Sequence, residues 1–236
     1  MPDFRIVLVE PLYEMSIGLT CRVMKNFGFK DLCLVRPRTN ISDVSRRFAV
    51  KASDLLERIT IVDSLEEAVK GFDIKIGTTG KLAGPRNVVR TVVPPWHLRG
   101  LLKLDGKVAL IFGREDIGLT NDELSMCDMV VNIPTSDEYP VMNITHAIAI
   151  ILYELSRSHV RPKVRLANER LRRVALKYFS DILKSINFLP EKEEKAKIVF
   201  KRILGKSFIS QKEIHILLAF LHKVHLKLMD SAAKKS

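Results

Sequence analysis

Three segments of the 236-residue chain combine glycines with polar side chains, as ligand-binding loops do. They are residues 16–22 (SIGLTCR), 111–119 (IFGREDIGL) and 133–143 (IPTSDEYPVMN). Glycines let a backbone approach a ligand closely, acidic and amide side chains bond to its polar groups, and an arginine fork can bind a phosphate. Each segment alone is equally consistent with an ordinary turn or helix cap, so its meaning depends on where the fold places it.

The segment at 111–119 fits neither of two familiar phosphate-binding loops. Gly113 and Gly118 do not have the spacing of the dinucleotide fingerprint, and the Lys-Ser or Lys-Thr that ends a Walker loop is missing. The sequence therefore does not predict a protein that binds a dinucleotide or a nucleoside triphosphate in either of those loops.

The cysteines and histidines do not form a metal-binding pattern. Cys21, Cys33 and Cys127 are odd in number, widely spaced and surrounded by apolar residues. This predicts buried, reduced thiols rather than a disulfide framework or a zinc site. His222 and His225 share one face of a predicted helix, but two imidazoles without further ligands seldom hold a metal. We therefore expect no metal site.

The elements that must position the three segments can be read from the hydrophobic pattern of residues 1–156. Short apolar runs predict buried strands at 6–9, 32–35, 59–62, 74–76, 108–112 and 129–133. Amphipathic segments at 17–27, 65–69, 95–102 and 121–126 lie between them. Continuously apolar strands separated by helices predict an α/β fold with a parallel sheet covered on both faces. Loops at the carboxyl ends of such strands are the usual ligand sites.

The rest of the chain is helical in pattern. Residues 143–155 are apolar on most sides, which predicts a buried helix, within the fold or in a subunit interface. Residues 157–168 are polar and basic and predict a linker. Helical spacing then recurs at 169–185, 191–204 and 211–230. We expect an α/β domain at 1–156, a linker at 157–168 and a small all-α extension at 169–236.

The positive charge is concentrated in the C-terminal third. The chain has 39 Lys and Arg against 27 Asp and Glu, and residues 157–236 hold 20 of the former but only 7 of the latter. A basic module beside a neutral one favours nucleic-acid binding over a merely solvated surface. The candidate RNA contacts in the extension are Arg170, Arg172, Arg173, Lys177, Lys201, Arg202 and Lys206.

In combination and in order, the three segments resemble the SpoU branch of the SPOUT RNA methyltransferases. That family has an early N-x-G-x-x-x-R motif, here residues 16–22 with Ser16 in place of Asn. A G-x-E-x-x-G loop follows, here 113–118, and then an Asn before an apolar helix, here Asn143 and Leu-Tyr-Glu at 152–154. Residues 5–10, 24–28, 77–79 and 112–121 are similar to the TrmJ group of tRNA ribose 2′-O-methyltransferases. The resemblance runs from Phe4 to about Asp230.

The resemblance implies a deep trefoil knot, with S-adenosyl-L-methionine bound in it as the cofactor. It also implies a homodimer in which the early motif of one chain completes the site of the other. The cofactor-binding residues it implies are Thr78, Thr79, Gly80, Gly113, Glu115, Gly118, Leu119, Ile133, Met142 and Asn143. It implies catalytic roles for Arg22, Ser16 and Asn143, with Arg22 and Arg114 also contacting RNA. The implied substrate is tRNA, methylated on the ribose of nucleotide 32 in the anticodon loop.

Three alternatives remain open at this stage: a ribosomal RNA methyltransferase of the same fold, a non-catalytic cofactor-sensing RNA-binding protein, and a basic DNA-associated protein. The family's Ser two residues before Asn143 is Val141 here, which cannot take a catalytic hydrogen bond. Arg22 is intact, which favours an enzyme. Residues 6–9 are too short for a signal peptide and no run reaches the ~20 apolar residues of a membrane span, so we expect a cytosolic protein without a membrane anchor.

Overall fold

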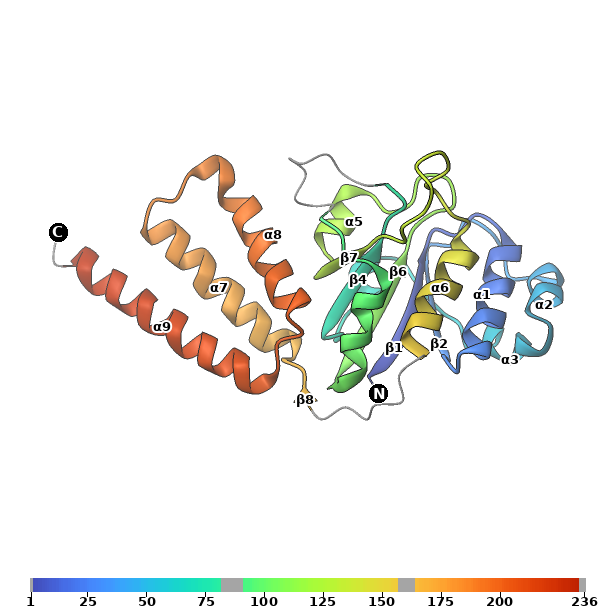
Figure 1. Cartoon of the computed structure of the whole chain (residues 1–236), viewed down its shortest axis with the longest axis horizontal. Helices are drawn as coiled ribbons and strands as arrows, with labels where there is room; N and C mark the ends of the chain where they lie inside the picture. The colour runs from blue at the N-terminus through green and yellow to red at the C-terminus, as the bar shows by residue number, and fades with distance from the viewer. Residues whose placement is uncertain (1, 82–90, 157–163, 234–236) are drawn as a thin grey trace.

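The α/β part is built on one six-stranded, fully parallel sheet (Figure 1). The computed structural model describes residues 2–81, 91–156 and 164–233. The strand order is β3-β2-β1-β6-β4-β7. The strands are β1 (Asp3–Val9), β2 (Asp31–Val35), β3 (Thr60–Val62), β4 (Ile74–Thr78), β6 (Lys107–Phe112) and β7 (Met129–Val131). All six predicted strands and their parallel arrangement are confirmed.

The central strands are buried on both faces because their side chains alternate between two apolar cores. Ile6 and Leu8 of β1 pack with helices α1 (Glu14–Asn26) and α6 (Ile144–Ser156) on one face. Val7 and Val9 pack with the short helices α4 (Leu65–Ala68) and α5 (Asn121–Ser125) on the other. This two-sided burial is what makes the strand sequences continuously apolar.

Several local elements differ from the sequence-based expectation. The predicted helix at 95–102 is a 3₁₀ helix, η3 (Pro95–Lys103). Between β2 and β3 the chain forms α2 (Asp43–Ala49), η1 (Val50–Ala52) and α3 (Ser53–Leu56), which were not predicted. Two-residue strands β5 (Leu104–Asp105) and β8 (Val164–Arg165) pair in parallel, so the predicted linker contains a strand. Residues 157–163 of that linker lie outside the described residues.

The C-terminal extension consists of α7 (Glu169–Ser185), α8 (Pro190–Lys206) and α9 (Gln211–Ala233), as predicted. The three helices project from one side of the α/β part (Figure 1) and share a small core of their own. Asn168 caps α7 by accepting from the backbone N–H of Leu171. At the start of α9, Ser210 and Glu213 each accept a hydrogen bond from the other's backbone N–H, as their capping-box spacing predicts.

The three cysteines are buried thiols that do not ionise readily. Cys21, Cys33 and Cys127 are buried and free of disulfides, as predicted. Burial raises the pKa of the Cys21 thiol to about 12 and that of Cys33 to about 11, so neither is a reactive thiolate.

In the part of the chain that the structure describes, no helix is long and apolar enough to cross a membrane.

Candidate active site

A pocket lies at the carboxyl edge of the sheet, where three loops meet. Its walls come from residues 78–81 after β4, residues 112–119 at and after the end of β6, and residues 133–144 leading into α6. Its empty space is about 840 Å³ when the part open to solvent is counted. The three loops are far apart in sequence but adjacent here because β4 pairs with both β6 and β7.

Nine of the ten predicted cofactor-binding residues line this pocket, and Asn143 is the exception. The other lining residues, which were not predicted to bind the cofactor, are mostly apolar. They are Lys81, Phe112, Arg114, Asp116, Ile117, Val131, Pro140, Val141, Ile144, Ala147 and Ile151. The buried ones at strand ends, such as Phe112 and Val131, have the same apolar pattern as an ordinary core, and the exposed ones, such as Lys81 and Asp116, have no pattern of their own.

Hydrogen bonds between neighbouring segments hold the loop after β4 in place. The Thr78 hydroxyl donates to the carbonyl of Ile111 at 3.0 Å, and the Thr79 N–H donates to the carbonyl of Val131 at 3.0 Å. The Asn132 side-chain amide donates to the carbonyl of Thr79 at 2.8 Å. The loop is therefore fixed by β6 and β7 before any ligand arrives, and a bound molecule meets a preformed wall.

The loop after β6 folds back on itself, and its glycines make this fold possible. The Gly118 N–H donates to the Arg114 carbonyl at 2.9 Å. A Cβ on Gly113 would lie 2.1 Å from the Gly118 carbonyl carbon, so no side chain fits at this position. Gly118 has a φ of 72°, in the left-handed region that favours glycine. The spacing of the two glycines thus serves a tight loop whose backbone forms one pocket wall.

Glu115 connects this loop to the neighbouring β1–α1 loop and keeps one oxygen for another partner. Its Oε2 accepts from the Leu12 N–H at 2.9 Å. Its Oε1 is buried and has no hydrogen-bond partner among the described residues. A buried carboxylate oxygen without a donor costs about 1–3 kcal/mol. Oε1 is therefore suited to accept from a hydroxyl or amine of a ligand in the pocket.

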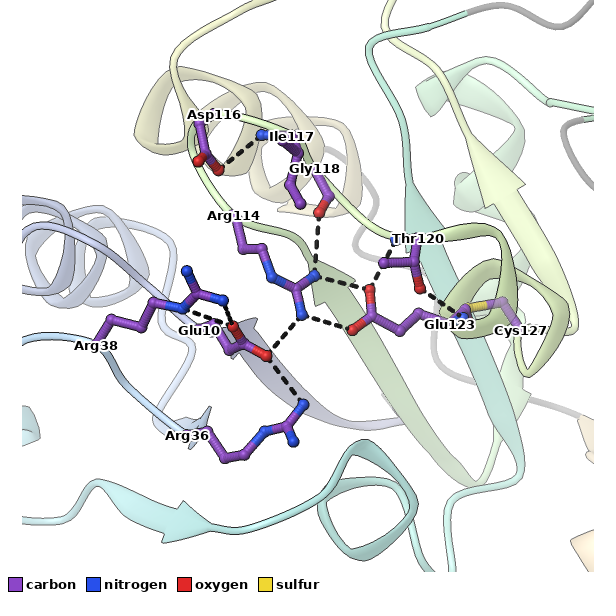
Figure 2. A network of polar contacts seen from close by, with 10 residues as sticks. All are labelled: Glu10, Arg36, Arg38, Arg114, Asp116, Ile117, Gly118, Thr120, Glu123 and Cys127. Carbon is purple, nitrogen blue, oxygen red and sulfur yellow. Dashed lines mark hydrogen bonds and ion pairs between the residues drawn. The ribbon is translucent and has the colours of Figure 1, made fainter.

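Arg114, predicted to contact RNA, is instead buried in a polar network beside the pocket (Figure 2). Its guanidinium donates to Glu10 at 2.7 Å, to both oxygens of Glu123 at 3.0 Å and to the Gly118 carbonyl at 3.3 Å. These bonds raise the pKa of Arg114 above its ordinary value. With these partners the side chain is committed to holding the loop, and a direct contact with RNA through it is not compatible with this position.

The predicted catalytic residues do not all reach the pocket of their own chain. Arg22 lies exposed on α1 and is not part of the lining, and Ser16 is buried in the first turn of the same helix. Gly18, between them, packs against α2, where a Cβ would lie 2.3 Å from the Ser45 carbonyl oxygen. Asn143 caps α6, because its Oδ1 accepts from the N–H and the hydroxyl of Thr145 at 2.9 and 2.7 Å.

Three of the cations predicted to contact RNA face the α/β part instead. Arg172 is buried and pairs with Asp128 at 3.3 Å. Lys201 donates to the Met126 carbonyl at 2.6 Å, and Arg202, also buried, donates to the Leu124 carbonyl at 3.5 Å. These carbonyls lie at the carboxyl end of α5, where the helix dipole favours cations. The three side chains therefore dock the extension and are not available to RNA.

The remaining predicted RNA contacts are more accessible. Arg170, Arg173 and Lys177 are exposed and follow one another at helical spacing along one face of α7. Lys206 is half-buried at the end of α8. The sequence pattern could not separate these cations from the docking ones, because an arginine that covers a helix end and an exposed arginine occupy the same polar positions of an amphipathic helix.

Comparison with known proteins places both parts of the chain in one group. A model of the SpoU rRNA Methylase family matches residues 3–153. The tRNA (cytidine-2′-O-)-methyltransferase TrmJ of Methanocaldococcus jannaschii is 37% identical over 221 residues, covering 91% of this chain and 96% of that relative. A probable methylase family protein of Haemophilus influenzae has a TM-score of 0.65 at 28% identity, covering 98% of this chain and 99% of that structure.

A further solved structure is similar over the α/β part. The SpoU methyltransferase AviRb of Streptomyces viridochromogenes, in complex with the cofactor AdoMet, has a TM-score of 0.51 at 21% identity. The match covers 66% of this chain and 58% of that one, and it shows a shared fold. The matches to the relatives from Methanocaldococcus and Haemophilus cover 91% and 98% of this chain and therefore extend beyond the α/β part into the helical extension.

Proposed function

The chain belongs to the SpoU rRNA Methylase family, and from that membership we propose that it is an S-adenosyl-L-methionine-dependent tRNA ribose 2′-O-methyltransferase. The observation that carries the proposal is the 37% identity to a tRNA (cytidine-2′-O-)-methyltransferase over nearly the whole of both chains. The preformed pocket at the carboxyl edge of the sheet supports it, since nine of the ten residues that we expect to bind the cofactor line it. We further propose nucleotide 32 of the anticodon loop as the target.

The pocket suits a cofactor that has both apolar and hydrogen-bonding parts. Phe112, Val131 and Ile151 provide apolar surface for an adenine ring or a methylene chain. The backbone of residues 113–118 and the orphan Oε1 of Glu115 provide polar contacts for hydroxyl and amino groups. When bound, S-adenosyl-L-methionine supplies a methyl group already activated on a sulfonium, and the protein must then orient the ribose and manage the proton of its 2′-hydroxyl.

We assign to Arg22 the task of orienting the ribose and managing the proton of its 2′-hydroxyl. A guanidinium remains protonated at neutral pH, so its simplest role is to bind an RNA phosphate through its fork and orient the adjacent ribose. The alternative role is removal of the hydroxyl proton by Arg22 itself. Both roles need Arg22 at the pocket, which it does not line within its own chain.

We propose that the enzyme is a homodimer in which Arg22 of one subunit lies at the pocket of the other. The distance between Arg22 and the pocket of its own chain is then no obstacle to its role. The outward side of α6 carries His146, Ile150 and Tyr153, of which Ile150 is half-buried and the other two are exposed, next to α1. Such a face is suited to isologous pairing about a two-fold axis. We also propose that the segments 112–119 and 133–144 around the pocket form the trefoil knot of the family, and that the enzyme acts in the cytoplasm.

The direct test is methyl transfer from labelled S-adenosyl-L-methionine to unmodified tRNA transcripts, followed by mapping of the modified ribose. We expect a single 2′-O-methyl group at nucleotide 32. An Arg22→Ala variant should lose turnover while it binds the cofactor with near-normal affinity, because the task we assign to Arg22 is to hold the RNA and not the cofactor. Incorporation into ribosomal RNA but not into tRNA would refute the substrate, and parallel loss of turnover and cofactor binding in Arg22→Ala would refute the role of Arg22.

A further inference from the structure

Beside the candidate active site, three arginines share one buried carboxylate. Glu10, which follows β1, accepts from Arg114 at 2.7 Å, from Arg36 at 2.9 Å and from Nε of Arg38 at 2.7 Å. Figure 2 shows the Glu10 carboxylate enclosed by the three guanidinium groups. The hydrogen bond from Arg114 is the main reason that the pKa of Glu10 falls to about 2, so Glu10 is ionised throughout the physiological range.

The three arginines are not equivalent in their remaining capacity to bind an anion. Arg114 is buried and is also neutralised by Glu123. The Arg36 and Arg38 side chains are 58% and 57% exposed, and in the described part of the chain their only carboxylate partner is Glu10. The cluster therefore has three positive and two negative charges, and its excess charge faces solvent. A guanidinium has five N–H donors, and Arg36 uses only one of its nitrogens on Glu10.

The position of this pair relative to the pocket is set by the sheet. Arg36 and Arg38 follow β2, so they lie at the same carboxyl edge as the pocket. The Arg38 N–H donates to the Pro11 carbonyl at 3.1 Å, and the next residue, Leu12, donates its N–H to Glu115 of the pocket wall. The β1 and β2 ends and the pocket loop are thus joined through direct hydrogen bonds, with Arg114 between the exposed pair and the pocket.

An RNA strand whose ribose reaches the pocket and which runs along this edge of the sheet brings its flanking phosphates to the exposed arginines. Phosphate groups are bound well by arginine forks, and a fork that is already oriented loses less side-chain entropy on binding. The Glu10 carboxylate provides that orientation for both exposed arginines. We propose that Arg36 and Arg38 form a binding site for a backbone phosphate of the substrate RNA, next to the ribose that is methylated. This inference rests on the proposed function and extends the RNA contacts from the basic extension to the α/β domain.

The test compares two variants that each remove two exposed positive charges. One is Arg36→Gln/Arg38→Gln, and the matched control is Arg46→Gln/Arg47→Gln on α2. tRNA binding is measured directly over a range of salt concentrations, and cofactor binding is measured by calorimetry. We expect the first variant to bind tRNA about tenfold more weakly and to reduce the slope of log affinity against log salt by roughly 1–2, whereas the control stays near wild type. Cofactor affinity should be unchanged in both.

Two results would overturn the site. The first is that Arg36→Gln/Arg38→Gln binds tRNA with the same affinity and the same salt slope as the control variant. The second is that Arg36→Gln/Arg38→Gln loses cofactor affinity along with tRNA affinity, which would show that the two arginines support the pocket. An Arg38→Lys variant guards against misfolding, because it keeps the charge that balances Glu10, and we expect a wild-type salt slope with weaker tRNA binding. Failure of the proposed function would look different: the wild-type protein would bind tRNA with the same dependence on Arg36 and Arg38 but transfer no methyl group.

Discussion

At the level of single residues, Gly113 and Glu115 shape the pocket in different ways. Gly113 acts through the absence of a side chain, because the Gly118 backbone occupies the space where a Cβ would be. Glu115 acts through two oxygens with separate tasks, one bonded to Leu12 and the other buried without a partner. Both residues belong to the motif G-x-E-x-x-G. A side chain at position 113 would collide with the loop, and a side chain without a carboxylate at position 115 would lose the bond to Leu12 or the free oxygen.

We expect Gly113→Ala to reduce cofactor affinity strongly, because the loop must open to relieve a contact of 2.1 Å. Overpacking of this kind costs typically 1–3 kcal/mol, and opening of the loop moves the backbone groups of the pocket wall. If that cost falls on the bound state, calorimetric titration with S-adenosyl-L-methionine should show an affinity about five- to hundredfold lower, by the conversion of 1.4 kcal/mol per tenfold. Thermal unfolding should show a lower midpoint.

The control for this prediction is Gly28→Ala. Gly28 has a φ of 80°, and a Cβ there would meet nothing within 4 Å, so only backbone strain of about 1 kcal/mol is added. Gly28→Ala should therefore be slightly less stable but bind the cofactor normally. Normal cofactor affinity in Gly113→Ala would show that the close approach of Gly113 and Gly118 is not needed for the pocket.

At the level of elements, Glu10 joins the ends of β1 and β2 to the loop after β6. Glu10 and Arg36 both have positive φ angles, of 47° and 42°, which are unfavourable for residues with side chains. Their mutual ion pair, together with Arg114, holds the two strand ends in this conformation. The buried Glu10–Arg114 pair connects the end of β1 to the pocket loop, whereas the exposed Arg36 acts on the end of β2.

We expect Glu10→Gln to destabilise the fold by about 3 kcal/mol at neutral pH, because it leaves Arg114 buried with a partner removed. The pKa of Glu10 is lowered from 4.5 to about 2 in the folded state. Its stabilising effect is therefore present above pH 4.5 and is lost as the pH falls toward 2. Urea unfolding at a series of pH values should show a steep fall in wild-type stability across this range and a shallower fall in Glu10→Gln.

An exposed ion pair provides the comparison. Glu57 pairs with Arg46 at 3.4 Å, and both side chains are more than half exposed. Glu57→Gln should change stability by less than about 1 kcal/mol, as surface pairs do, and should keep the wild-type pH dependence. A Glu10→Gln variant with the same pH dependence as wild type would exclude Glu10 as the group responsible.

The elements show clearly what could be predicted from sequence and what could not. Strands such as β1 and β6 are continuously apolar, so burial on both faces made them visible. Helices α2 and α3 were missed because α2 is short and mostly exposed and α3 is a single turn, and neither shows an amphipathic period over its length. α8 was expected to end at Leu204 but continues through Gly205 and Lys206. Gly205 serves close packing on Asp128 there, rather than helix termination.

The exposed cations of α7 are the part of the extension that we expect to bind tRNA. Arg170→Gln/Arg173→Gln should weaken tRNA binding and reduce its salt slope by roughly 1–2, because two phosphate contacts are lost. Lys192→Gln/Lys195→Gln on α8 removes the same charge near Glu191 and Glu194 and should change the slope little. Filter binding at several salt concentrations distinguishes the two. Equal effects would mean that the extension acts through its overall charge and not through α7.

At the level of the whole molecule, the site could be predicted only in part. The residues around the pocket were found because the motifs kept their family spacing, and their order along the chain matches their three loops. That Arg22 and Ser16 lie away from the pocket of their own chain agrees with the family resemblance, which implies that the early motif serves the partner's site. The spacing of the motif alone could not indicate this, because spacing along a chain does not say which subunit a residue serves. The docking of the extension through Arg172, Lys201 and Arg202 was hidden for a similar reason, since it depends on contacts between parts distant in sequence.

The proposed dimer can be tested by mixing two variants that are each inactive alone. Arg22→Ala keeps a complete pocket, and Gly113→Val keeps Arg22 but has its pocket blocked. If Arg22 acts on the partner's pocket, a heterodimer of the two variants contains one complete site. The Arg22→Ala subunit supplies the pocket of that site, and the Gly113→Val subunit supplies its Arg22. Unfolding and refolding an equal mixture should therefore restore about a quarter of wild-type methyl transfer, because half of the dimers have one of two sites. Each variant refolded alone should stay inactive. If Arg22 served its own pocket, every heterodimer would lack a complete site, so a mixture as inactive as its components would exclude action across the interface.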